Sequence, residues 1–132
     1  MTASNVEIVR SLFDRFGRDS VAGALELLSE DFVVVIPPSM SAEPDVYEGH
    51  DGALRYFGGF DGLLEDVRFE PLELVEEGDA VIVWLRLAGR GVASGIEVEQ
   101  FAATLVGVAD GKVTRIEPYP DVEAARAALR GW

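Results

Sequence analysis

Arg86 and Glu99 are the two side chains in this sequence best suited, by type and spacing, to do chemistry. They lie on apolar segments joined by the connection GRGVASG, residues 89–95. If the chain reverses near Val92 and Ala93, these segments pair as antiparallel strands with Arg86 opposite Glu99 on one face. Two interpretations remain open. The pair is either a cross-strand ion pair or part of a pocket wall, where Arg86 orients a ligand oxygen and Glu99 acts as base or acceptor.

The same register sets Trp84 opposite Phe101 and Ala88 opposite Glu97, on the same face as the charged pair. Glu97 and Glu99 are then two residues apart on that face. If both were buried, their mutual repulsion would raise the pKa of one of them and suit acid–base work. The alternative is a solvated rim, where neither carboxylate is perturbed.

Aromatic side chains are the candidates for a ligand-binding surface. Trp84, Phe101, Tyr56 and Phe57 are expected in the core, and some of them in the lining of a pocket. The sequence does not distinguish which of them face a ligand.

The single histidine, His50, lies in the segment YEGHDGALRYF, residues 47–57. In GHDG before a helix, His50 or Asp51 falls at the N-cap, where a side chain accepts a backbone hydrogen bond. We therefore favour a structural role over a catalytic one. With one histidine, no cysteine and no calcium-loop spacing, we expect neither a metal site nor a cofactor.

Composition limits the class of protein. The chain has 132 residues, the size of one domain, and 48% of them are hydrophobic. The net charge of −13 excludes a nucleic-acid or anionic-membrane partner, since both need a basic surface. The acidity indicates solubility or, alternatively, steering of a cationic ligand. We expect a cytoplasmic protein, because there is no cysteine, no signal-peptide core and no membrane-spanning apolar run.

Helical periodicity marks the first part of the chain. Ser4 and Glu7 form a predicted capping box, and the helix they start is expected to end near Gly17. A second helix is expected from about Asp19 through Leu28.

A buried strand, a long loop and a third helix are expected next. The segment DFVVVIPP, 31–38, is typical of a buried strand ended by two prolines. The Pro/Ser/Glu-rich residues 37–48 are expected to form a loop long enough to be a lid or a pocket mouth. A third helix then runs through Phe57.

From about Val67 the hydrophobic period changes to two, which predicts four consecutive strands. Hairpin turns are expected at 76–79 and 109–112, and Asp121 is expected to cap a short last helix. Consecutive hairpins imply an antiparallel sheet with helices packed on one face, an α+β domain. The strands are apolar on both faces, so we expect a homodimer that covers the second sheet face.

This order of elements, together with YEGHDGALRYF, DAVIVWLRLAGRG and DGKVTRIEPYPD, resembles the nuclear transport factor 2-like superfamily. Within it the chain resembles the SnoaL-like polyketide cyclase and ketosteroid isomerase-like branch. The resemblance covers residues 1–132 as a single SnoaL-like domain. It implies a cone-shaped fold, in which a curved antiparallel sheet wraps around N-terminal helices, with a short C-terminal helix. It also implies an apolar pocket and, commonly, a dimer.

The catalytic carboxylates of two such enzyme groups are absent. The resemblance places the ketosteroid isomerase base at Ile36, the oxyanion-hole tyrosine near Leu12 and the protonated aspartate near Ala103. Against limonene epoxide hydrolases, the arginine matches Arg86, while the two aspartates fall on Ala88 and Pro118. The resemblance puts Arg86 and Ala103 on the pocket side.

These observations leave the question of catalysis open. One hypothesis is a dimer with an apolar pocket for a small hydrophobic molecule, which, if it is an enzyme, is of the cyclase, isomerase or hydrolase type and uses Glu99 and Arg86. The second is a non-catalytic small-molecule-binding or accessory domain. A third is a protein–protein module that uses the exposed sheet face, which a monomer in sedimentation would support.

Overall fold

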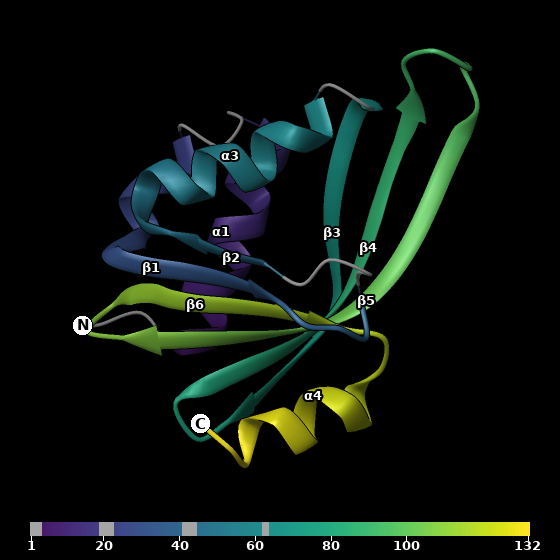
Figure 1. The fold of residues 1–132 in the computed structure, drawn as a ribbon. Helices are drawn as coiled ribbons and strands as arrows, with labels where there is room; N and C mark the ends of the chain where they lie inside the picture. Colours follow the sequence, from purple (N-terminus) through teal and green to yellow (C-terminus); the bar gives the residue numbers. More distant parts are fainter. Residues whose placement is uncertain (1–3, 19–22, 41–44, 62–63) are drawn as a thin grey trace.

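The computed structural model describes residues 4–18, 23–40, 45–61 and 64–132. Helix α1 (Asn5–Arg18) is followed by a short 3-10 turn (Leu25–Leu27) and strand β1 (Leu28–Ile36). Then come β2 (Asp45–Glu48), α3 (Gly49–Asp61), β3 (Leu64–Glu77), β4 (Ala80–Gly91), β5 (Glu97–Ala109), β6 (Lys112–Tyr119) and α4 (Val122–Leu129). Figure 1 shows the strands curving around α1 and α3, with α4 on the other side of the sheet.

The six strands form one sheet in the order β2-β1-β6-β5-β4-β3. The α+β fold and its curved sheet are confirmed, but the sheet is mixed rather than wholly antiparallel, because β1 pairs with β6 in parallel. The hairpins β3–β4, β4–β5 and β5–β6 are antiparallel, as the turn signals predicted. The parallel pair arises because β1 and β6 are far apart in the chain, so no hairpin sets their relative direction.

Two predicted boundaries differ from the structure. Leu28, expected at the end of a second helix, is a buried residue that begins β1. Residues 45–48, expected in a loop, form β2 and pair with β1, with Val34 opposite Tyr47. The start of the expected second helix, at residues 19 and 20, lies outside the described residues. Short edge strands are hard to predict, because four residues carry little periodic signal.

Helix starts follow the predicted capping chemistry at both ends of the chain. The Ser4 hydroxyl accepts from the Glu7 backbone N–H at 3.2 Å. Asp121 Oδ1 accepts from the Ala124 backbone N–H at 2.8 Å. Each bond satisfies one N–H that the first turn of a helix leaves unpaired.

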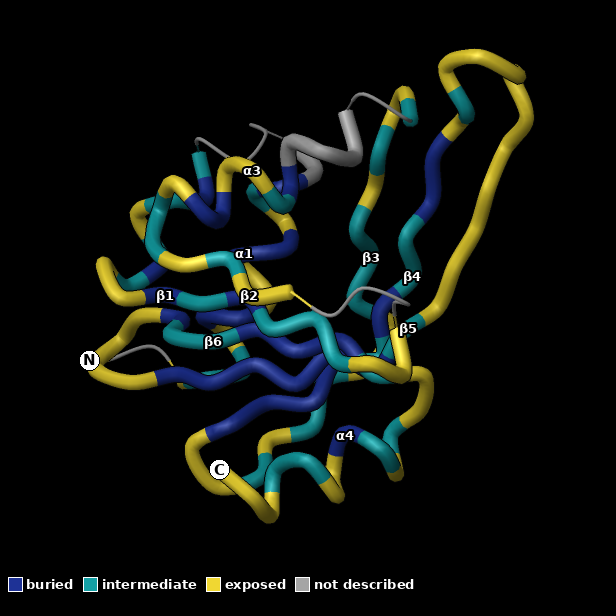
Figure 2. Tube along the Cα trace, viewed as in Figure 1, coloured by how far each residue is buried: buried dark blue, intermediate teal, exposed yellow. Residues whose placement is uncertain are grey.

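The curved sheet separates two apolar clusters. The larger one fills the concave side, where α1 and α3 pack on the sheet, and it includes Val81, Val83 and Leu85 of β4. The smaller one lies under α4 on the convex side and includes Ile82 of β4 and Ala125 of α4. Figure 2 shows the buried residues concentrated in the middle of the sheet and the exposed ones at the β4–β5 tip. The concave side is therefore where an enclosed cavity can form.

Candidate ligand-binding cavity

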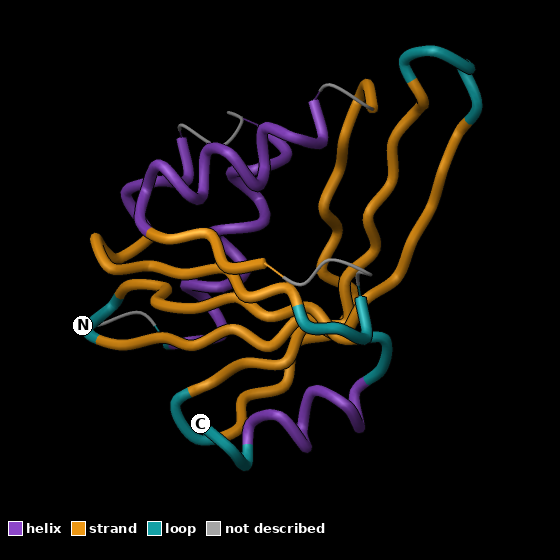
Figure 3. Tube along the Cα trace, in the orientation of Figure 1, coloured by secondary structure: helices purple, strands orange, loops and turns teal. Residues whose placement is uncertain are grey.

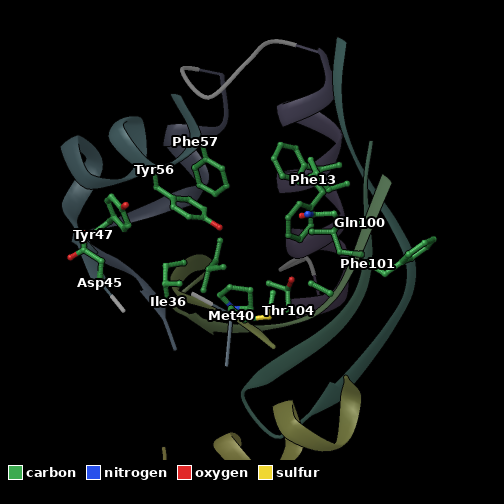
Figure 4. Close-up of a pocket in the computed structure, with 16 residues that line it drawn as sticks. Phe13, Ile36, Met40, Asp45, Tyr47, Tyr56, Phe57, Gln100, Phe101 and Thr104 are labelled. Carbon is green, nitrogen blue, oxygen red and sulfur yellow. The ribbon is translucent and has the colours of Figure 1, made fainter. Parts of the chain in front are cut away.

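A cavity of about 550 Å³ lies between the concave face of the sheet and helices α1 and α3 (Figure 4). Its volume is within the range of small-molecule pockets, roughly 300–1,000 Å³. Most of the residues around it are apolar: Phe13, Ile36, Met40, Phe57, Phe69, Leu85, Leu87, Ala102, Ile116 and Pro118. The arrangement can bury an apolar molecule of moderate size.

Helix α3 supplies the aromatic wall. Tyr56 and Phe57 both line the cavity, and their ring centroids are 4.8 Å apart. Tyr47 of β2 packs on Tyr56 at 5.2 Å, and Phe69 of β3 on Phe57 at 6.0 Å. These edge-to-face and tilted contacts hold the rings in fixed positions. Two of the four aromatic residues expected at the ligand, Tyr56 and Phe57, therefore line the cavity, and their contact with a ligand stays a prediction.

Strand β5 and helix α3 supply polar groups to the cavity. Gln100 and Thr104 lie two periods apart on β5, so both face the concave side together with Ala102. In Figure 4 the Tyr56 hydroxyl and the Gln100 amide point into the space between α3 and the sheet, and Thr104 lies at its floor. Burial and, secondarily, the neighbouring Tyr47 raise the pKa of Tyr56 to about 12. The phenol is therefore protonated at neutral pH and can donate a hydrogen bond.

Arg86 and Glu99 do not line this cavity. Arg86 lies on the opposite face of β4 from Leu85 and Leu87, with its Nε 2.6 Å from Glu99 Oε2 and its Nη1 2.6 Å from Glu70 Oε1. The hydrogen bond to Glu99 is the main cause that raises the pKa of Arg86. Even-numbered residues of β4 face the convex side, so the pair lies outside the wall of this cavity, and its role at a ligand stays a prediction. The predicted cross-strand ion pair is present.

The register of the β4–β5 hairpin differs from the predicted one by two residues. Arg86 lies opposite Phe101, and Ala88 opposite Glu99. The five-residue loop closes through bonds from Gly91 N to Ile96 O and from Gly95 N to Gly91 O, which moves the turn toward the C-terminus. A shift of two keeps every side chain on its predicted side of the strand relative to its neighbours. Arg86 therefore still reaches Glu99, diagonally instead of directly.

Trp84 and Phe101, the other two aromatic candidates, lie together on β4 and β5. Trp84 belongs to the cluster beneath α4 and does not line the cavity. Phe101 borders the cavity, but its ring stacks on Trp84, with centroids 5.8 Å apart and planes at 15°. Figure 4 shows that ring turned away from the cavity. Both rings sit on the convex face. The sequence did not predict this face, because β4 is apolar on both sides and the pattern does not indicate which side the helices cover.

Two positions matched to enzyme carboxylates do reach the cavity. Ile36, at the position of the isomerase base, and Pro118, at that of a hydrolase aspartate, both line it. Leu12 is instead fully buried in the core of the concave side, and Ala103 faces the α4 cluster, contrary to the expected pocket side. At the cavity positions where those enzymes carry carboxylates, this chain has apolar side chains.

His50 has a structural contact. Its Nε2 lies 3.1 Å from the Leu28 carbonyl oxygen, so the imidazole joins the first turn of α3 to the start of β1. The helix begins at Gly49, so His50 and Asp51 lie inside its first turn and not at the N-cap, where one of them was expected. The ring does not line the cavity.

Several lining residues were not predicted from the sequence, Gln100, Thr104, Phe13 and Phe69 among them. The signal for Gln100 and Thr104 was available: both alternate with Phe101 and Ala103, so they had to face the opposite side from the predicted site. Within the described residues, no group of His, Cys, Asp and Glu side chains could hold a metal ion. No described helix is both long and apolar enough to cross a membrane.

A family model for the SnoaL-like domain matches residues 9–116. No curated protein matches the chain. Among solved structures, a protein with a ketosteroid isomerase-like fold from Catenulispora acidiphila, in complex with trimethylamine, is 16% identical with a TM-score of 0.76. That match covers 94% of this chain and 92% of the other.

Two further solved structures are similar over almost their whole length. TerC, co-crystallised with polyporic acid, is 23% identical over 96% of this chain and 98% of its own, with a TM-score of 0.76. An NTF2-like protein from Burkholderia xenovorans is 28% identical over 97% of both chains, with a TM-score of 0.71. These likenesses support the cone-shaped fold observed here.

Proposed function

The chain belongs to the SnoaL-like domain family, and from that premise we propose that it binds a small apolar molecule in the concave-side cavity. The observation that carries this proposal is the lining of the 550 Å³ cavity, which is mainly aromatic and aliphatic. Burial of an apolar ligand there is favoured by about 25 cal/mol for each Å² of apolar surface removed from water. Two similar structures, one in complex with trimethylamine and one co-crystallised with polyporic acid, show that proteins of this fold are found with small organic molecules.

Binding without catalysis is the form of this proposal that the residues support best. Asp45 is the one carboxylate among the described lining residues, and its side chain is exposed and accepts from the Val46 backbone N–H at 2.7 Å. Proton abstraction from a carbon acid needs a base within hydrogen-bond reach of the substrate and donors at the developing oxyanion. The positions matched to such a base, Ile36 and Pro118, are apolar.

An enzyme of the cyclase or isomerase type is the second candidate. It is favoured by one observation, the protonated Tyr56 hydroxyl directed into the cavity, which is placed to act as an acid or an oxyanion donor. Arg86 and Glu99 stay a predicted catalytic pair that a substrate would have to reach on the convex face. If the protein turns over a substrate, activity that is kept in the Tyr56→Phe variant and lost in the Glu99→Gln variant would support that pair.

A cavity-filling substitution tests the binding proposal. Ala102 lies on the cavity wall, so Ala102→Trp should fill the space and weaken binding of the neutral fluorescent probe N-phenylnaphthylamine by about tenfold or more. Binding is measured from the rise in probe fluorescence on titration. Ala127→Trp, at an exposed position on α4, is the matched control and should leave binding unchanged. A wild-type protein that does not bind the probe, or equal binding by both variants, would contradict the proposal.

A further inference from the structure

In addition to Tyr47 of β2, three uncharged polar side chains line the cavity from two elements. The Tyr56 hydroxyl comes from α3, and the Gln100 amide and Thr104 hydroxyl come from alternate positions of β5. Thr104 is only 3% exposed, so its hydroxyl is a buried polar group at the cavity floor. Figure 4 shows Tyr56 and Gln100 directed toward one another across the space. A ligand that fills the cavity is therefore in contact with hydrogen-bonding groups on opposite walls.

The charge around the cavity is very different from that of the whole protein. Among the described lining residues, Asp45 is the one charged side chain, and none is basic. Asp45 is exposed at the edge, where water screens it. An anion in the cavity would lose its hydration without a cationic partner, and a cation would lack a buried counter-charge. Desolvation therefore disfavours both kinds of ion.

We infer that the cavity selects an uncharged ligand with a hydrogen-bond acceptor, such as a carbonyl, ether or phenol oxygen, held by Tyr56 and the polar side of β5. The inference rests on the proposed function and adds to it the chemical class of the ligand. The apolar lining supplies most of the affinity, and the polar groups set the orientation of the ligand. Tyr56 stays protonated at neutral pH and serves as a donor.

Three compounds with one bicyclic frame separate these contributions: indane, the ketone indanone and an indane carboxylate. Each is titrated against wild-type protein by displacement of N-phenylnaphthylamine. We expect the carboxylate to bind at least about tenfold more weakly than indanone, because its charge is not compensated in the cavity. Equal affinities for the ketone and the carboxylate would overturn the inference.

Conservative variants then test the polar contacts. Tyr56→Phe and Thr104→Val each remove one hydroxyl and little volume, so indanone binding should weaken about three- to tenfold while indane binding is unchanged. Tyr119→Phe is the matched control: its hydroxyl donates to Glu117 on the convex face and is not in the cavity lining, so neither ligand should be affected. Thermal unfolding of each variant checks that it is folded.

The outcomes distinguish this inference from the proposal on which it rests. If indane and indanone bind to wild-type protein, but each variant weakens the binding of both compounds equally, the cavity is a binding site and the acceptor preference is wrong. If none of the three compounds displaces the probe from wild-type protein, both statements fail. The wild-type comparison of ketone and carboxylate remains decisive even if a variant does not fold.

Discussion

Tyr56 combines an apolar position with a titratable group. Burial, with a smaller effect from Tyr47, raises the pKa of its phenol from 10.0 to about 12. Below about pH 10 the phenol is protonated in both the folded and the unfolded chain, so folding does not depend on it. Above that pH the unfolded phenol ionises while the folded one keeps its proton. The unfolded state then binds fewer protons, and the free energy of unfolding falls as the pH rises.

A comparison of wild-type protein with Tyr56→Phe isolates this effect. Between about pH 9 and pH 11, the wild-type protein should lose about 1.3 kcal/mol more stability than the variant, as expected for a pKa raised from 10 to 12. Urea unfolding at each pH gives the two free energies. Parallel pH profiles for the two proteins would show that Tyr56 titrates at its ordinary pKa.

The site residues show how far sequence reasoning reaches. Tyr56 and Phe57 were predicted as ligand contacts and line the cavity, because a helix that covers a sheet must direct its large apolar residues inward. Arg86 and Glu99 were predicted to form a pair and do so at 2.6 Å, but on the convex face. Strand periodicity groups residues by face, and it does not say which face the helices cover when both are apolar.

Helix α3 approaches β2 so closely that its second turn requires a glycine. A Cβ added to Gly52 would lie 2.6 Å from the carbonyl carbon of Tyr47. Tyr47 in turn packs on Tyr56 in the cavity wall. The position of the aromatic wall therefore depends on the absence of a side chain at residue 52.

Gly52→Ala should destabilise the protein by about 1–3 kcal/mol, although alanine ordinarily favours a helix over glycine by about 1 kcal/mol. The reason is the clash with the β2 backbone, which cannot be relieved by rotating a side chain. Gly131→Ala is the control, since a Cβ added there would lie at an ordinary 3.5 Å from the Ala128 carbonyl oxygen. Chemical unfolding measures the free energy of unfolding of both variants. A Gly52→Ala protein as stable as wild type would show that α3 and β2 can separate.

Elements with strong periodicity were predicted well, and those defined by tertiary contact were not. The hairpin strands from β3 to β6 and helix α4 follow from alternation, turn residues and the Asp121 cap. Strand β2 is held by pairing with β1, a contact that four residues of sequence do not encode. Predicting the β4–β5 register required knowing which of the glycines in GRGVASG closes the turn. Gly95 takes a φ of +70°, and the loop closes around it.

For the whole molecule, we propose a homodimer through the convex face of the sheet. Phe101 is 42% exposed there and stacks on Trp84, beside the charged group of Arg86, Glu70 and Glu99. An apolar pair rimmed by charges is typical of an interface core with a polar rim. A second copy related by twofold symmetry would bring the same surface against itself.

Phe101→Lys should shift the protein toward the monomer, because it places a charge at the centre of the expected interface. Analytical ultracentrifugation over a range of concentrations measures the change. Leu54→Lys, at an exposed apolar position on α3, is the control and should leave the association unchanged. A wild-type protein that sediments as a monomer would contradict the dimer and favour a surface for another protein.

The parallel pairing of β1 with β6 has a consequence for how the protein is made. Ile36 at the end of β1 and Ile116 of β6 border the same hollow, yet some 80 residues of chain separate them. Contacts between such distant segments form slowly, since a long loop must close first. During synthesis on the ribosome, we therefore expect the ligand-binding space to be completed only after the last strand has emerged. A ligand would then meet the finished protein and not the growing chain.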